Sequence, residues 1–206
     1  MNKHVLFSIF MTLFSWSFLN AQCDFVAPYT EDFEDAGALD ACWIQSTSDD
    51  LDWEVNSGSS SYSETGPESA HGGTYYVHMN PPFQSNGQTA SLLSPNIDLS
   101  NVTNPYLEFY YHMYGSGMDP DGSVAIDISS DGGTNWTNLW SRTGSQSNNW
   151  LSTNVSLSGY SGVVNFKITA TISSGYYWLN HFALDDFSIL ATPTCRVHFI
   201  LSHKKK

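Results

Sequence analysis

The amino-acid sequence predicts an all-β fold, a sandwich of antiparallel sheets. From Gln88 onward, several segments alternate apolar and polar residues with a period of two, which is the pattern of half-buried strands. Turn-forming residues interrupt each apolar pattern, and no segment shows sustained helical spacing. Strands joined by turns at this spacing are typical of a sandwich.

We predict each strand from the apolar residues that alternation places on one of its faces. His112 alternates with the apolar residues of the first strand, so we expect it to face outward. The half of the chain before Gln88 has a weaker strand pattern, and we expect short strands and long loops there. The apolar faces are Leu107, Phe109, Tyr111 and Met113; Val124, Ile126 and Ile128; Val164, Phe166, Ile168, Ala170 and Ile172; and a last strand over Phe182–Leu190.

One turn has a recognisable hairpin sequence. Ser129 to Trp136 is similar to the Asp-box hairpin of sialidase-like propellers, in which the Asp side chain caps the turn. A single copy does not predict a propeller. We therefore expect a hairpin, with Asp131 and Gly132 forming its turn.

The first 21 residues have the features of a secretory signal peptide. Lys3 precedes an apolar run from Val5 to Leu19, and a cleavage site follows near Ala21. The run is too short for a membrane anchor, so we expect no membrane span in the mature chain and a secreted, extracellular or cell-surface location. A lipoprotein anchor at Cys23 is the alternative, but Gln22 precedes it where a small residue is required.

Length and charge narrow the class of protein. About 185 residues remain after the leader, enough for one domain that buries roughly 70% of its unfolded surface. All 20 acidic residues lie between Asp24 and Asp186, and the bases in that span are Arg142 and Lys167. This balance argues against a nucleic-acid partner, which needs clustered bases. It favours a bound hard cation or a soluble acidic surface.

The chain has three cysteines, and the expected export would place them in an oxidising compartment. Cys23 and Cys42 are the natural disulfide pair, and they close a short loop near the start of the domain. Cys195 is left over, so it is free or pairs outside the chain.

The many aromatic residues divide into two groups. Trp43, Trp53 and Trp140 lie inside hydrophobic strings and are expected in the core. The candidates for ligand binding are Tyr176, Tyr177 and Trp178, which fall in an expected loop. The common hydrolase and phosphate-binding motifs are absent, so no catalytic residue is predicted. A nucleophile activated by one of the domain's histidines stays open, because such groups need only meet in space.

Two acidic clusters stand out by position. One contains Glu31, Asp32, Glu34 and Asp35 with Asp49, Asp50 and Asp52, and the other is Asp185 with Asp186. If the first and last strands lie side by side, these carboxylates converge and require a cation, and oxygen ligands select Ca²⁺. The alternative is that most of these side chains extend into water.

The chain resembles the MAM domain over nearly its whole length from Cys23 to Leu190. This domain is known from meprins, neuropilins and receptor tyrosine phosphatases, and the part from Cys23 to Trp53 is most similar to bacterial secreted versions. The strings that carry the resemblance occur in family order: Phe33-Glu34-Asp35, Cys42-Trp43-Ile44-Gln45, Asp50-Leu51-Asp52-Trp53, Ala90-Ser91-Leu92-Leu93-Ser94-Pro95, Leu107-Glu108-Phe109-Tyr110-Tyr111-His112-Met113-Tyr114-Gly115, Leu139-Trp140 and Ala183-Leu184-Asp185-Asp186-Phe187-Ser188-Ile189.

The resemblance implies a jelly-roll domain over residues 23–190 that serves in adhesion or oligomerisation without catalysis. It also implies a structural Ca²⁺ ion, with ligands Glu34, Asp50, Asp52 and Asp185 and with Asp186 as a substitute. The family's third cysteine has no counterpart before Leu107, where Pro105 and Tyr106 stand. The basic tail 191–206 fits nothing in the family and is expected to be disordered or truncated.

Two functional hypotheses follow, with a weaker third. The first is a non-catalytic recognition module that binds an extracellular protein or glycan, or forms a homo-oligomer. The second is a Ca²⁺-dependent carbohydrate-binding module, accessory to an exported hydrolase, which stacks sugars on Tyr176, Tyr177 and Trp178. The third is a hydrolase fragment. Fold analogy alone does not name the ligand.

Overall fold

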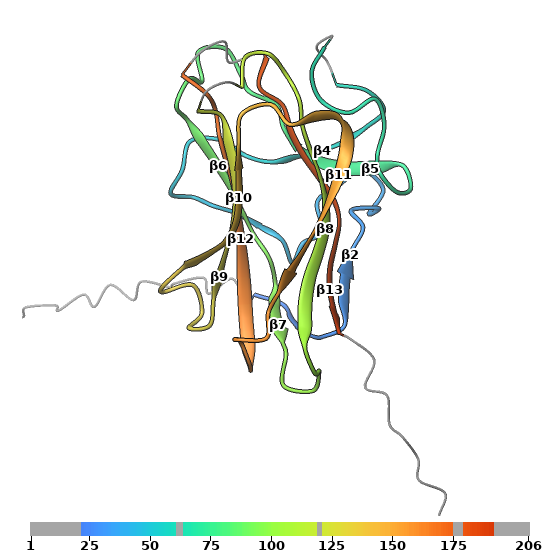
Figure 1. The fold of residues 1–206 in the computed structure, drawn as a ribbon, viewed down its shortest axis with the longest axis vertical. Helices are drawn as coiled ribbons and strands as arrows, with labels where there is room; N and C mark the ends of the chain where they lie inside the picture. The colour runs from blue at the N-terminus through green and yellow to red at the C-terminus, as the bar shows by residue number, and fades with distance from the viewer. Residues whose placement is uncertain (1–21, 61–63, 119–120, 175–178, 192–206) are drawn as a thin grey trace, which may run out of the picture.

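A computed structural model describes residues 22–60, 64–118, 121–174 and 179–191. These residues form thirteen β-strands and no α-helix, which confirms the all-β prediction. The strands form two sheets packed face to face, with β9, β10 and β12 on one side of Figure 1 and β8, β11 and β13 on the other. The expected leader, the aromatic candidates Tyr176, Tyr177 and Trp178, and the tail beyond Ala191 with Cys195 lie outside the described residues.

The first sheet has seven strands arranged around β12, the longest alternating run of the sequence. β12 pairs with β9 along one edge and with β7 and then β6 along the other, and each of these pairings is antiparallel. β1 pairs with β7 in parallel, which the alternation did not predict. The strands are β1 (Asp24–Val26), β3 (Ile44–Gln45), β6 (Thr89–Leu93), β7 (Asn96–Asp98), β9 (Ser123–Ser129), β10 (Thr137–Thr143) and β12 (Val163–Thr171).

The second sheet has six strands arranged around β13, the last strand of the described chain. β8 pairs with β13 along one edge, and β5 and then β2 pair with it along the other. The strands are β2 (Tyr29–Glu31), β4 (Glu54–Ser57), β5 (Tyr75–Met79), β8 (Pro105–Met113), β11 (Ser147–Ser156) and β13 (Phe182–Ala191).

The core lies between the sheets and is built from the predicted faces. Phe109 from β8, Phe166 from β12 and Phe187 from β13 are each 0% exposed, and the ring of Phe187 packs against the other two. Trp43, Trp53 and Trp140 are also buried, as predicted. Burying one such large side chain contributes about 1.5–3 kcal/mol to the free energy of unfolding.

β13 contains a bulge that its sequence requires. Leu184 and Phe187 both enter the core although they are three residues apart, and strict alternation would put them on opposite faces. The register with β8 shifts between Asp185 and Ser188, and Asp186 takes a φ of 50°. Aspartate tolerates this left-handed conformation better than most residues, and the extra residue of the bulge lets both apolar side chains face inward.

The hairpin between β9 and β10 forms as predicted. Asp131 Oδ1 accepts hydrogen bonds from the Asn135 backbone nitrogen and the Ser129 hydroxyl, both at 2.8 Å, so the side chain caps the turn. Within the described residues, no helix has the length and hydrophobicity needed to cross a membrane.

Candidate functional site

Glu34 binds the loop that leads into β5. We call residues 71–74 the glycine loop, after Gly72 and Gly73. Glu34 Oε1 accepts hydrogen bonds from the backbone nitrogens of Thr74 and Tyr75, each at 2.7 Å. Gly73 has a φ of 59°, which favours glycine, and a Cβ atom there would also displace the Glu34 carboxylate.

Asp185 approaches the glycine loop from β13. Its side chain is 0% exposed, and Oδ2 accepts hydrogen bonds from the backbone nitrogens of His71 at 2.8 Å and Gly72 at 3.2 Å. Burial raises the pKa of Asp185 from 3.8 to about 7; the nearby charge of Asp186 adds to the rise, and the backbone hydrogen bonds oppose it. Glu34 and Asp185 therefore meet at one loop, as the predicted pairing of the chain's two ends requires.

Asp186, the predicted substitute ligand, lies beside the same loop. Its Oδ2 is 2.6 Å from His71 Nδ1. The His71 ring in turn stacks on Tyr110 of β8, with 3.4 Å between ring centroids. The bulge in β13 thus places Asp185 beneath the glycine loop, on the outer face of the sheet, and Asp186 beside His71.

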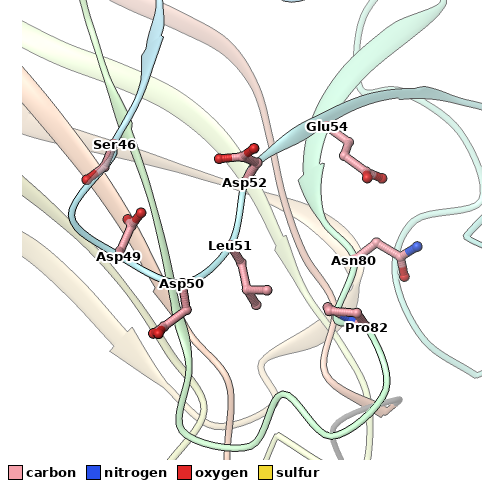
Figure 2. Close-up of a pocket in the computed structure, with 8 residues that line it drawn as sticks. All are labelled: Ser46, Asp49, Asp50, Leu51, Asp52, Glu54, Asn80 and Pro82. Carbon is pink, nitrogen blue, oxygen red and sulfur yellow. The ribbon is translucent and has the colours of Figure 1, made fainter.

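Asp50 and Asp52 lie in a different place. Figure 2 shows them on the loop between β3 and β4. With Asn80, they line a hollow of about 370 Å³. Asp49 Oδ2 and Asn80 Oδ1 are both buried there without a hydrogen-bond partner. We call this the acidic hollow, lined by Ser46, Asp49, Asp50, Leu51, Asp52, Glu54, Asn80 and Pro82.

The four predicted metal ligands do not form one coordination shell. Glu34 accepts a hydrogen bond from Tyr75, the first residue of β5. The acidic hollow reaches Asn80, which directly follows the last residue of β5. Five residues of strand separate the two places by roughly 16 Å. In the described part of the chain, no three His, Cys, Asp or Glu side chains gather closely enough to hold a metal ion.

A buried histidine cluster lies on the outer face of the six-stranded sheet. His78 Nδ1 and His181 Nε2 are 3.0 Å apart, and His78, His112 and His181 are each at most 4% exposed. Burial lowers the pKa of His78 and His112 to about 4 and that of His181 to about 3. The positive charges of His78 and His112 lower the pKa of His181 further.

The expectation that His112 faces outward needs a correction. His112 lies on the outer face of β8, but it is only 1% exposed. Segment 64–73 covers this face: Trp150 packs against His112 and donates its indole N–H to the Ser69 carbonyl oxygen. Segment 64–73 has no periodic pattern of apolar residues, so the sequence does not predict that it covers the histidines.

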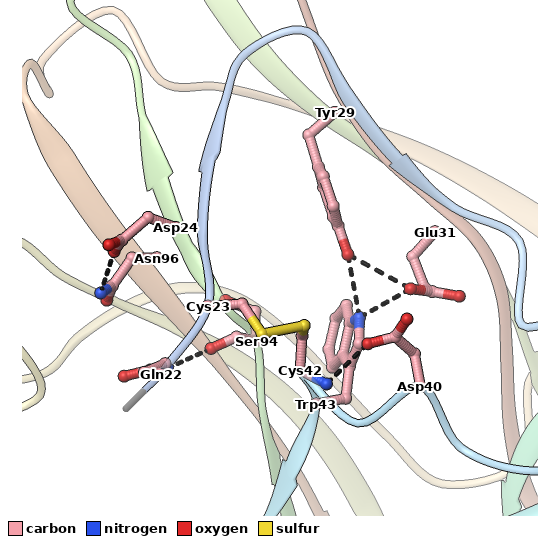
Figure 3. The surroundings of a disulfide bond; sticks show 10 residues. All are labelled: Gln22, Cys23, Asp24, Tyr29, Glu31, Asp40, Cys42, Trp43, Ser94 and Asn96. Carbon is pink, nitrogen blue, oxygen red and sulfur yellow. Dashed lines mark hydrogen bonds between the residues drawn. A yellow bond between two sulfur atoms is a disulfide. The ribbon is translucent and has the colours of Figure 1, made fainter. Parts of the chain in front are cut away.

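The disulfide between Cys23 and Cys42 is present, as predicted, with its Cα atoms 5.3 Å apart (Figure 3). It joins the start of the seven-stranded sheet to the segment before β3. Closing a loop of 19 residues stabilises a fold by about 3 kcal/mol through the lost freedom of the unfolded chain.

Glu31, from the first acidic cluster, has a structural role beside Trp43, the residue that follows Cys42 of the disulfide. Its carboxylate accepts hydrogen bonds from the Trp43 indole at 3.0 Å and the Tyr29 hydroxyl at 3.2 Å (Figure 3). It also accepts one from the Phe33 backbone nitrogen at 2.8 Å. Burial raises its pKa, and these hydrogen bonds oppose the rise. Glu31 is thus occupied within the fold and does not face solvent.

Comparison with known proteins identifies similar sequences. The family model described as "MAM domain, meprin/A5/mu" matches residues 32–196. MAM domain-containing protein 2 of Mus musculus is 31% identical over 144 residues, which is 68% of this chain and 20% of that protein. Zonadhesin of Oryctolagus cuniculus is 32% identical over 129 residues, 61% of this chain and 5% of that protein. The chain spans about a fifth or less of these curated relatives.

Solved structures with the same architecture are more distant in sequence. A cleaved adhesin domain of Lys-gingipain from Porphyromonas gingivalis has a TM-score of 0.56 at 19% identity, covering 81% of this chain and 99% of that one. TmCBM61, solved in complex with β-1,4-galactotriose, has a TM-score of 0.53 at 16% identity, covering 78% and 94%. These similarities confirm the jelly-roll sandwich.

Acidification is expected to destabilise the fold through the buried histidines. The pKa values of His78, His112 and His181 are lower in the folded chain than the ordinary 6.5. The stability that the neutral histidines contribute to the fold is therefore present above about pH 6.5 and is lost as the pH falls toward 4. Asp185 acts oppositely, because its raised pKa favours the folded state below about pH 7. Because three histidines destabilise the fold on acidification and Asp185 alone stabilises it, the urea concentration at the unfolding midpoint should be lower at about pH 5 than at about pH 7.

The variant His181→Gln isolates this effect, because it removes one of the three titrations. It should lose less stability than the native chain over the same pH interval, whatever its stability at neutral pH. His78→Gln is the second variant if the first does not fold. An equal pH dependence in native and variant chains would contradict the assignment.

Proposed function

Because the chain belongs to the MAM domain family, we propose that it is a non-catalytic recognition module that acts outside the cell. The observation that carries the proposal is the family match over residues 32–196, which includes strands from both sheets. We take the domain as residues 23–190, because the disulfide at Cys23 ties the first strand to the rest. Adhesion or oligomerisation is the role implied by the family resemblance.

The burial of the histidines supports a non-catalytic role. A hydrolase that uses a histidine as its base needs that histidine to come within hydrogen-bond reach of the substrate. His78, His112 and His181 are enclosed under segment 64–73, and their lowered pKa values result mainly from burial. His71 is the more accessible histidine, but it is held between Asp186 and Tyr110.

Two features support an extracellular location. The disulfide between Cys23 and Cys42 persists in oxidising compartments and is uncommon in the cytosol. The first 21 residues have the composition of an export signal. We propose that the chain is exported and is of the bacterial secreted type, as the resemblance between Cys23 and Trp53 suggests.

The partner is a protein or a glycan of the extracellular space, or a second copy of the chain. The alternative of a carbohydrate-binding module is favoured by the shared sandwich, since TmCBM61 was solved in complex with a galactotriose. The aromatic residues first assigned to sugar stacking, Tyr176, Tyr177 and Trp178, remain part of that hypothesis.

We also propose a structural Ca²⁺ ion, held at one end of β5. Glu34 and Asp185 converge on the glycine loop and offer only oxygen ligands, which suits a hard cation. Asp50 and Asp52 form the competing pair in the acidic hollow. One ion takes one pair only, because its ligands lie within about 2.6 Å of the metal.

Removing the ion is expected to lower the thermal unfolding midpoint. A ligand at about 100 times its Kd stabilises the folded state by about 2.7 kcal/mol, which corresponds to about 5–10 °C for a domain of this size. Calorimetry of the native chain in excess Ca²⁺ and in excess chelator measures the shift.

A pair of matched variants locates the ion. Glu34→Gln should abolish the chelator shift if the glycine loop holds the ion, and Asp50→Asn should leave the shift intact. The reverse result would place the ion in the acidic hollow. The absence of a shift in the native chain would exclude a structural Ca²⁺ ion.

The recognition function is tested by comparing binding with turnover. Beads coated with the purified chain are expected to cluster or to bind surfaces coated with extracellular matrix protein or glycan. Peptide and polysaccharide substrates should give no product above buffer. Reproducible turnover that His112→Ala or His181→Gln abolishes would contradict the proposal, and so would a complete absence of binding and self-association.

A further inference from the structure

The outer face of the seven-stranded sheet is formed by rows of residues in register. Leu93 of β6 pairs with Ile44 on one side and with Lys167 on the other, and Lys167 pairs with Asp127 of β9. Directly paired residues point to the same side of a sheet. The neighbouring row of Leu92, Ile168 and Ile126 is buried, so the first row faces outward.

The next rows on this face have short side chains. Ser91 pairs with Thr169, their hydroxyl oxygens are 3.0 Å apart, and Thr169 pairs with Ala125. Two residues further along, Thr171 pairs with Thr89 and with Ser123. Beyond the row that holds Lys167 and Asp127, the face is therefore low, uncharged and lined with hydroxyl groups. It belongs to central strands, so an added peptide strand has no free edge to pair with here.

Trp136 forms a wall at one end of this face. It directly precedes β10, at the end of the Asp131 hairpin, and its side chain is half-buried. Lys167 Nζ lies 4.8 Å from the centroid of the indole ring and 3.3 Å from Asp127 Oδ2. Asp127 also accepts a hydrogen bond from the Asn138 side chain at 2.9 Å. The charges beside the indole are thus paired with one another.

Between this wall and the loop after β3 lies a groove of about 500 Å³, within the size range of small-molecule sites. Ile44 and Leu93 contribute apolar lining, and Ser46, Thr47 and Ser48 contribute hydroxyl groups from the β3 side. We call it the Trp136 groove. It combines an aromatic ring, an apolar floor and a hydroxyl rim, whereas the outer face of the other sheet is covered by segment 64–73.

We propose that the Trp136 groove binds a segment of an uncharged oligosaccharide. A sugar ring has an apolar C–H face that packs on an indole and a rim of hydroxyl groups that exchange hydrogen bonds with serine and threonine. An anionic sugar is disfavoured by the net charge of −13 and by the pairing of Lys167 with Asp127. A protein partner would need several aromatic anchors spread over about 800 Å² of surface, and this groove offers one aromatic ring, that of Trp136.

The inference rests on the proposed recognition function and names its ligand class and its place. It moves the sugar-stacking role from Trp178 to Trp136. These are independent positions, because Trp136 belongs to the hairpin between β9 and β10, and Trp178 precedes β13.

An array of neutral and acidic glycans, followed by titration calorimetry, tests the inference with the full chain. The array includes β-1,4-linked galactose, glucose and xylose oligomers beside sulfated and uronic-acid glycans. The native chain should bind at least one neutral oligomer. Trp136→Ala should weaken that binding by about tenfold or more, because central aromatic anchors carry much of a site's affinity. Trp136→Phe, which keeps a ring, should recover part of the loss.

The matched control is Trp150→Ala, which removes a half-buried tryptophan from the other sheet. This variant should bind the neutral oligomer as tightly as the native chain, and circular dichroism checks that each variant is folded. Unchanged affinity in Trp136→Ala, equal loss in Trp150→Ala, or binding of acidic glycans only would overturn the inference. If no glycan binds but the beads still cluster or bind protein, the groove proposal fails and the recognition function stands.

Discussion

The fold depends on the pairing of its last described strand with strands from both halves of the chain. β13 is hydrogen-bonded to β8 along one edge and to β5 and β2 along the other. Its side chains Phe182, Leu184, Phe187 and Ile189 are each at most 1% exposed, so the strand also supplies the centre of the core. The six-stranded sheet is incomplete until β13 is in place, and the contacts it makes span most of the sequence.

This arrangement gives the two sheets different outer faces. The position of β13 beside β5 brings Asp185 to the glycine loop, and segment 64–73 then folds over the six-stranded sheet and encloses the histidines. The seven-stranded sheet instead carries a groove on its outer face, with Trp136 at one end of it. The six-stranded sheet therefore carries buried ionisable groups, whose protonation makes the stability of the fold depend on pH. The other carries a groove suited to recognition.

Sequence patterns predicted the parts of the fold that depend on one buried face. Leu107 to Met113 and Val164 to Ile172 alternate because each strand has a core side, and the strands appear where expected. Leu184 and Phe187 are three residues apart, which departs from the period of two and indicates a bulge once both side chains are known to be buried. The burial of His112 and the outward row through Lys167 were not predictable, because they depend on a covering segment and on cross-strand register. The candidate metal ligands were found by residue type, but their separation along β5 is a property of the folded chain.

Native-state amide hydrogen exchange tests the central place of β13 most directly. If β13 completes the fold as described, the amides of Leu184 and Ile189 should exchange only through global unfolding, with the protection of the strongest amides in β8. Edge strands such as β4 and β11 should exchange earlier through local opening. Early exchange throughout β13, while β8 stays protected, would show that the chain folds without its last strand and would contradict the account.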